Sequence, residues 1–134
     1  MDTMKRYEFS PQARAALEDL RVPLAIYQKV GRNVNTLMVS DGFLEVFGFD
    51  SREKACLEMD RDMYAYTHPE DLSRVTEAAI RFTREEAPYD LYYRVRSRRG
   101  GEYRMIHSVG RHVTTETGDR LAQVWYTDEG SAPQ

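Results

Sequence analysis

The sequence predicts an α+β domain in which helices are inserted between the second and third strands of a five-stranded antiparallel sheet and cover one of its faces. Two groups of strand-like segments carry this prediction. Residues 24–30 and 36–40 precede the helical segments, and residues 89–97, 102–113 and 120–128 follow them. Turns rich in Gly, Asn and Thr join the members of each group, so we expect hairpins and antiparallel pairing.

Length and charge limit the classes of function. The 134 residues suffice for one domain with one core. A net charge of -3 gives no basic footprint for nucleic acid. The chain has no apolar run near the roughly 20 residues of a membrane span and no signal-peptide core at its start. We therefore expect a cytoplasmic protein without nucleic acid partners or membrane insertion.

A flanking helix is expected over residues 10–21, with Ser10 as its N-cap and Pro11 at its first position. Its thin apolar stripe can lie against a sheet or against a second copy of the helix. We expect a homodimer in which this stripe and a tryptophan near the C-terminus form contacts: Ala13, Ala16, Leu17, Leu20 and Trp125. The predicted boundaries are 1–22 for the flanking helix, 23–128 for the domain and 129–134 for a polar tail or linker.

Two short helices are expected after the first hairpin. Ser40 or Asp41 can cap the first, and Gly48 can end it. The second covers about 50–59, and residues 59–68 form one more helical turn or irregular chain.

A longer helix begins after His68, with Pro69 and two acidic residues in its first turn. His68 is either a ligand or acid–base group, or a residue that shapes the start of the helix, and the local pattern favours the second reading. The buried stripe is expected at helical spacing, and Pro88 stops any continuation. The stripe residues are Leu72, Val75, Ala79, Ile80 and Thr83.

This order of elements, from about Pro23 to Asp128, resembles a PAS domain. "SDGFLEVFGF" resembles the PAS helix that ends in a Phe-Gly-Phe turn, and "THPEDLSRV" resembles the start of the long PAS helix. "YRVRSRRGGEYRMIHSVGRHV" is similar to the PAS hairpin, and "LAQVWYTDE" stands in the place of the final strand. Where the family often shows Asp-Ile-Thr, this chain has Tyr-Thr-Asp.

The chain looks most similar to PAS modules upstream of bacterial cyclic-dinucleotide enzymes or histidine kinases. The resemblance implies a non-catalytic sensory module that binds a small molecule or mediates dimerisation and biases an attached output domain. One alternative is a pure dimerisation module whose core is filled by side chains. Another is a small α+β enzyme that uses His107 as acid or base, which would need a His–Asp pair inside a deep pocket.

Two cofactors are disfavoured by the same resemblance. Haem-binding PAS domains usually take their axial ligand from the long helix, and residues 70–87 contain no histidine. Covalent flavin chemistry uses a cysteine in a Gly-Arg-Asn-Cys-Arg-type motif, and Cys56 lacks these neighbours. The single cysteine also excludes an intramolecular disulfide.

Candidate pocket residues follow from strand alternation. Met105, His107 and Val109 share one face of their strand, which we expect to look into a cavity under the helices. His107 is then either a core residue bonded to a neighbour or a polar group that meets a ligand, whereas His112 is expected to be exposed. The full set of candidates is Met38, Phe43, Phe47, Met63, Tyr66, Ile80, Tyr93, Val95, Met105, His107 and Val109, with Tyr64 as further wall.

The arginine-rich hairpin "YRVRSRRGGEYR" is the one basic patch. We interpret it as a solvated outer face paired with acidic residues, or as a contact with an acidic partner domain. The sequence contains no nucleophile elbow, Gly-rich phosphate loop or metal-ligand spacing.

Overall fold

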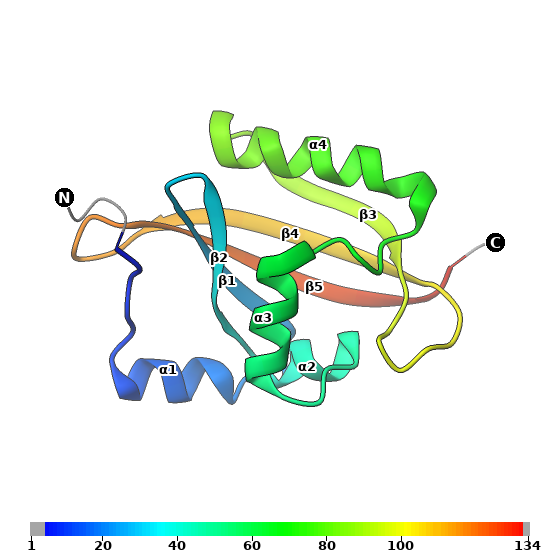
Figure 1. Cartoon of the computed structure of the whole chain (residues 1–134), viewed down its shortest axis with the longest axis horizontal. Coiled ribbons are helices and arrows are strands. Elements are labelled where there is room, and N and C mark those ends of the chain that lie inside the picture. The colour runs from blue at the N-terminus through cyan, green and yellow to red at the C-terminus, as the bar shows by residue number, and fades with distance from the viewer. Residues whose placement is uncertain (1–4, 133–134) are drawn as a thin grey trace.

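The structure, a computed structural model, describes residues 5–132. Within these residues, four helices and five strands follow one another (Figure 1). Their bounds are α1 Pro11–Glu18, β1 Leu24–Val30, β2 Asn33–Val39, α2 Asp41–Phe47, α3 Arg52–Asp62, α4 Pro69–Glu85, β3 Tyr89–Val95, β4 Arg104–Thr114 and β5 Arg120–Ser131.

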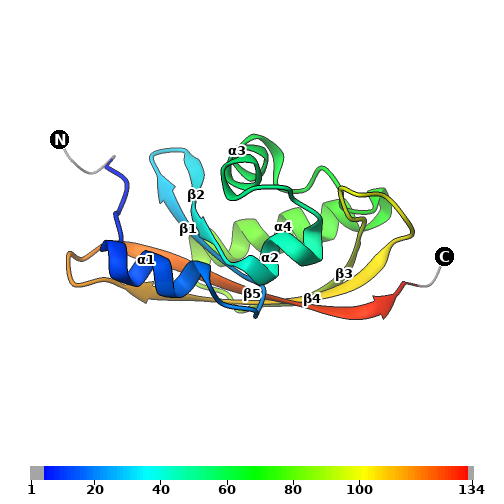
Figure 2. The ribbon, with the colours of Figure 1, turned by 90° about the horizontal axis from the view of Figure 1, so that it is seen from below.

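The five strands form one antiparallel sheet in the order β2-β1-β5-β4-β3. The three helices between β2 and β3 lie together on one side of it (Figure 2). The predicted fold class is therefore confirmed. The C-terminal strand β5 takes the central position, between β1 and β4, so both hairpins join through it.

Several element ends differ from the expected ones. The N-terminal helix ends at Glu18 and not near 21, and β2 begins at Asn33, so Gly31 and Arg32 alone make the hairpin turn. Strand β5 continues to Ser131, which pairs with Arg104. Residues 129–131, expected in a polar tail, are therefore part of the sheet.

Apolar side chains pack on both faces of the sheet. The inner face and the helices over it form the larger cluster, in which Phe43 of α2, Val75 of α4 and Ile106 of β4 are almost fully buried. The outer face carries a smaller cluster under α1 and the N-terminal segment. Its members are Leu24, Ile26, Leu37, Met38 and Leu121, with Tyr7, Phe9, Leu17, Val113 and Trp125 packed against them.

The N-terminal helix places only part of its predicted stripe on the sheet. Leu17 packs against the outer cluster, as does Trp125, whereas Ala13, Ala16 and Leu20 are exposed. A dimer contact through these exposed residues stays a prediction.

Helix α4 buries only part of the expected stripe, since Val75 is buried, Ala79 packs against the main cluster and Thr83 is half-buried. Asp71, Val75 and Phe82 are buried, whereas Leu72 and Ile80 are 40% and 45% exposed. The buried side also includes Asp71, which Arg94 holds against β3, and Phe82, whose ring packs on Tyr89.

Strand β4 also presents the opposite face from the expected one. Ile106 and Ser108 are buried under the helices, whereas Met105, His107 and Val109 lie on the outer face. Directly paired residues share a face of a sheet. Tyr93 of β3 faces the helices, and its partner is Ile106, so Ile106 must face them as well.

Candidate functional site

A cavity of about 110 Å³ lies between the inner face of the sheet and the helices. Aromatic and methionine side chains form most of its wall. It is lined by Tyr27, Val34, Phe43, Phe47, Met59, Met63, Tyr64, Tyr66, Thr67, Ala79, Phe82, Thr83, Tyr89, Tyr93, Val95, Arg98, Ala122, Val124 and Tyr126.

The structure brings part of the predicted pocket set together. The candidates that line the cavity are Phe43, Phe47, Met63, Tyr64, Tyr66, Tyr93 and Val95. Met38 belongs to the outer cluster because the register of the β1–β2 pair shifts between Thr36 and Met38, and Ile80 faces solvent. The expectation that Met105, His107 and Val109 face the cavity is wrong, because the strand register puts them on the outer face. A role in binding stays a prediction for the residues that do line the cavity.

Buried tyrosines of the wall satisfy their hydroxyl groups within the protein. The Tyr27 and Tyr126 hydroxyls hydrogen bond at 2.7 Å, and those of Tyr93 and Ser108 at 2.6 Å. Burial raises the pKa of Tyr93 to about 12, although its hydrogen bond with Ser108 acts in the opposite direction. Burial also raises the pKa of Tyr27 and of Tyr126 well above the ordinary value. These phenols are therefore neutral at pH 7 and poor acid–base groups.

Arg98 enters the wall from the loop between β3 and β4, where the sequence suggested a solvated patch. That interpretation is wrong for this residue, because its side chain is only 10% exposed. The guanidinium carbon lies 4.3 Å from the ring centroids of both Phe49 and Tyr66. Burial lowers the pKa of Arg98, and the carboxylate of Glu58 partly opposes this shift. Arg98 remains charged at pH 7, since even a large downward shift leaves a guanidinium protonated.

Gly48 allows the Arg98 loop to approach α2. It ends α2 in the left-handed conformation, with φ of 76°. A Cβ atom at this position would lie 2.3 Å from Ser97 Oγ and 3.1 Å from Arg98 N. The Arg98 amide donates to the carbonyl oxygen of Phe47 at 3.0 Å. The predicted helix-ending glycine therefore also fixes the loop that carries Arg98.

His107 forms a His–Asp pair, but outside the cavity. Its Nε2 lies 2.6 Å from Asp90 Oδ1, and its ring stacks on Tyr92 with centroids 4.1 Å apart. The side chain of Asp90 is 62% exposed. The enzyme alternative required this pair inside a deep pocket, and the pair lies on the open outer face of the sheet instead.

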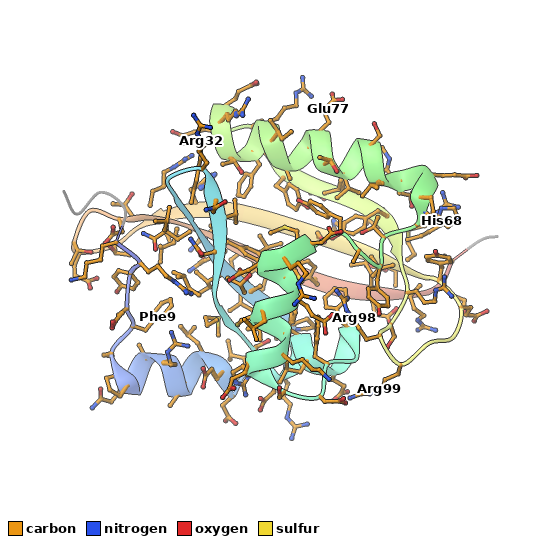
Figure 3. All side chains as sticks on the ribbon, viewed as in Figure 1. Phe9, Arg32, His68, Glu77, Arg98 and Arg99 are labelled. Carbon is orange, nitrogen blue, oxygen red and sulfur yellow. The ribbon has the colours of Figure 1, made fainter. Side chains whose placement is uncertain are left out.

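The other two histidines have local structural roles. His68 is the N-cap of α4, and its Nδ1 accepts a hydrogen bond of 3.0 Å from the amide of Glu70, as the favoured reading predicted (Figure 3). His112 was expected to be exposed but is partly buried. Its Nε2 donates to the carbonyl oxygen of Phe82 at 2.9 Å, and its ring stacks on the Phe82 ring.

Over residues 5–132, no group of three or more His, Cys, Asp or Glu side chains is placed to hold a metal ion. The helices described are all too short or too polar to cross a membrane. Cys56 lies in α3, and it is not among the residues that line the cavity.

Comparison with known proteins identifies this arrangement. The family model described as PAS fold matches residues 36–126, which is more than half of the chain. The chain belongs to the PAS family. The match spans β2 from Thr36 onward, the three helices over the sheet, strands β3 and β4, and β5 up to Tyr126.

Solved PAS structures share the fold at low sequence identity. A sensory box histidine kinase/response regulator from Burkholderia thailandensis E264 is 22% identical, with a TM-score of 0.57 over 89% of this chain and 82% of that one. The N-terminal domain of a diguanylate cyclase with PAS/PAC sensor from Marinobacter aquaeolei is 16% identical, with a TM-score of 0.61 over 81% and 95%. A PAS domain from the fruit-fly ELK potassium channel is 13% identical, with a TM-score of 0.68 over 92% and 99%.

The search of curated proteins gives no match. The chain is a PAS domain whose fold resembles that of solved structures from a histidine kinase and a diguanylate cyclase.

Proposed function

We propose that this PAS domain is a non-catalytic cytoplasmic sensor that holds a small molecule in the cavity and biases an attached output domain of the diguanylate cyclase or histidine kinase type. The cavity itself carries this proposal, because it lies between the helices and the central strand of the sheet. The similar structures from a histidine kinase and a diguanylate cyclase support the choice of output domain.

The position of β5 offers a route from the cavity to the C-terminal end of the domain. Val124 and Tyr126 of β5 line the cavity, and the same strand continues to Ser131. The hydroxyl pair of Tyr126 with Tyr27 links β5 to β1. A ligand that binds one arrangement of this pair more tightly than another shifts the population of β5 conformations by its difference in affinity.

Dimerisation without a ligand is the second candidate, and the small cavity favours it. A volume of about 110 Å³ is below the roughly 300 Å³ of a drug-sized site. The outer face also exposes apolar side chains beside His107, namely Tyr92 at 50% and Val109 at 37%. Such a face, together with the exposed part of the α1 stripe, suits a second copy of the chain.

Native mass spectrometry of the purified protein, with an absorbance scan of the same sample, separates these functions. A small co-purifying mass supports the sensor. An empty dimer supports the dimerisation module. An empty monomer that binds none of a panel of small metabolites contradicts both proposals.

A further inference from the structure

We infer that the ligand of this cavity is a small organic acid whose carboxylate pairs with the guanidinium of Arg98 and whose apolar body lies among the aromatic and methionine side chains. The inference rests on the proposed sensor function and names the class of molecule sensed.

Arg98 is chemically unlike the rest of the wall. Among the described residues that line the cavity, it is the only charged one. Its Nε and Nη2 atoms are buried and have no hydrogen-bond partner within the part of the chain that the structure describes. A buried charged donor without a partner is costly, so such groups in folded proteins usually meet a partner, water or a ligand.

Stacking on aromatic rings does not satisfy these two atoms. The guanidinium carbon lies 4.3 Å from the centroids of Phe49 and Tyr66, and such cation–π contacts are made by ring faces, which offer no lone pair. The N–H bonds of Nε and Nη2 lie in the guanidinium plane and point the same way along one edge. Two parallel N–H bonds of this kind match the two oxygens of a carboxylate.

Glu58 is the nearest internal competitor for this edge. Its Oε1 lies 3.7 Å from Arg98 Nε, which is an ion-pair distance but too long for a hydrogen bond. The Glu58 side chain is also 32% exposed, so solvent holds part of its charge. Glu58 therefore offsets part of the charge of Arg98 from beside its donor edge without a hydrogen bond, so both donors stay open to a ligand carboxylate.

The remainder of the wall defines the body of the ligand. The hydroxyl groups of Tyr27 and Tyr93 already have partners, so they offer little to a polar molecule. Met59 and Met63 give an adaptable apolar surface. A cavity of about 110 Å³ is somewhat smaller than one known to hold benzene, which indicates a body of no more than about six non-hydrogen atoms.

Figure 3 shows Arg98 beside α3, within the outline of the molecule, and Arg99 at the edge of the same loop. Arg99 is exposed and supplies a control of the same residue type. The test uses isothermal titration calorimetry of the protein, freed of any co-purifying molecule, with benzoate, phenylacetate and hexanoate and with the matched neutral amides benzamide, phenylacetamide and hexanamide. We expect at least one acid to bind about tenfold more tightly than its amide, since only the acid pairs with Arg98.

The Arg98→Met variant should lose this preference for the acid, while Arg99→Met keeps it. Arg98→Lys retains the charge but lacks the two parallel N–H donors of the guanidinium. It should therefore keep only a small part of the preference for the acid over its amide. Glu58→Gln removes the competing carboxylate and should tighten acid binding. Should Arg98→Met fail to fold, the loss of acid preference in Arg98→Lys relative to the unchanged protein decides the matter.

Three results would overturn the inference. Equal binding of acids and amides, or an acid preference that survives Arg98→Met, removes Arg98 from recognition but leaves a ligand-binding sensor. Loss of folding stability in both Arg98→Met and Glu58→Gln, with no acid bound by the unchanged protein, makes the pair a structural one. If no compound of either charge binds and none co-purifies, the ligand-binding function itself fails.

Discussion

Asp71 accepts three hydrogen bonds from Arg94, which ties the first turn of α4 to β3. The backbone amide of Arg94 donates to Oδ2 at 2.8 Å, its Nε to the same oxygen at 2.9 Å and its Nη2 to Oδ1 at 2.8 Å. Both side chains are largely buried, with exposed fractions of 8% for Asp71 and 18% for Arg94. A pair of this kind is costly to break from one side, because the remaining charge loses its partner.

The Asp71→Asn substitution should therefore reduce the free energy of unfolding at pH 7 by about 3 kcal/mol. Guanidinium chloride unfolding followed by circular dichroism measures the change. Glu70→Gln is the control, since Glu70 is exposed and lies 3.4 Å from Arg94, and it should cost less than about 0.5 kcal/mol. Equal losses in the two variants would contradict the buried role of Asp71.

The same pair predicts how stability depends on pH. The hydrogen bonds from Arg94 lower the pKa of Asp71 below its ordinary value of 3.8. A carboxyl group whose pKa is lower in the folded state stabilises the fold fully above the unfolded-state pKa, and this contribution is lost as pH falls toward the folded-state pKa. The difference in unfolding free energy between the unchanged protein and Asp71→Asn should therefore be constant from pH 7 to about pH 5 and shrink below about pH 4. A difference that stays constant at low pH would show that Asp71 titrates normally.

Gly48 and Gly118 allow a matched comparison of two left-handed glycines. Both have positive φ, but a Cβ atom at Gly118 meets nothing within 4 Å, whereas one at Gly48 meets the loop that carries Arg98. We expect Gly118→Ala to cost about 1 kcal/mol and Gly48→Ala about 2–4 kcal/mol, because only the second adds a steric clash to the backbone strain. Thermal or urea unfolding tests this, and similar costs would mean that the loop moves away freely.

The face presented by β4 can be checked by truncating neighbouring side chains. Ile106→Ala should lower the free energy of unfolding by about 3 kcal/mol, since this side chain is 2% exposed in the main cluster. Met105→Ala, on the outer face, should cost about 1 kcal/mol or less. If Met105→Ala cost more than Ile106→Ala in urea unfolding, the face of β4 that carries Met105 would be the buried one.

The Tyr93–Ser108 hydrogen bond offers a double-mutant cycle. Tyr93→Phe leaves the buried hydroxyl of Ser108 without its partner, and Ser108→Ala does the same to Tyr93, so each should cost about 1–2 kcal/mol. The double variant should lose less than the sum of both, because no orphaned group remains. Additive losses in unfolding experiments would exclude a coupled hydrogen bond.

Local sequence signals predicted the elements but not always the sides they bury. Ser40 and Gly48 mark the two ends of α2, and His68 with Pro69 marks the start of α4, because caps act within a few residues of the chain. The prediction of which face of β4 is buried was wrong, because alternation defines two faces without saying which one is inner. That choice depends on the pairing of Ile106 with Tyr93, which is distant in sequence.

Arg98 could not have been found from its neighbours. Arginine in a Gly-rich hairpin is normally exposed, and nothing within the hairpin indicates otherwise. Its burial results from Phe49 and Tyr66, which come from other parts of the chain, and from the close approach of the loop to Gly48. The aromatic cavity wall was easier to predict, since Phe43 and Phe47 share a helix face.

The sheet is one residue thick at the cavity. Tyr126 lines the cavity, while its neighbour Trp125 faces the outer cluster, so a single peptide bond separates the two environments. A displacement of Tyr126 therefore reaches the back of the sheet without travelling along the strand. If the cavity holds a ligand as proposed, a protein surface in contact with Trp125 would respond to that ligand through the thickness of the sheet, without movement along β5.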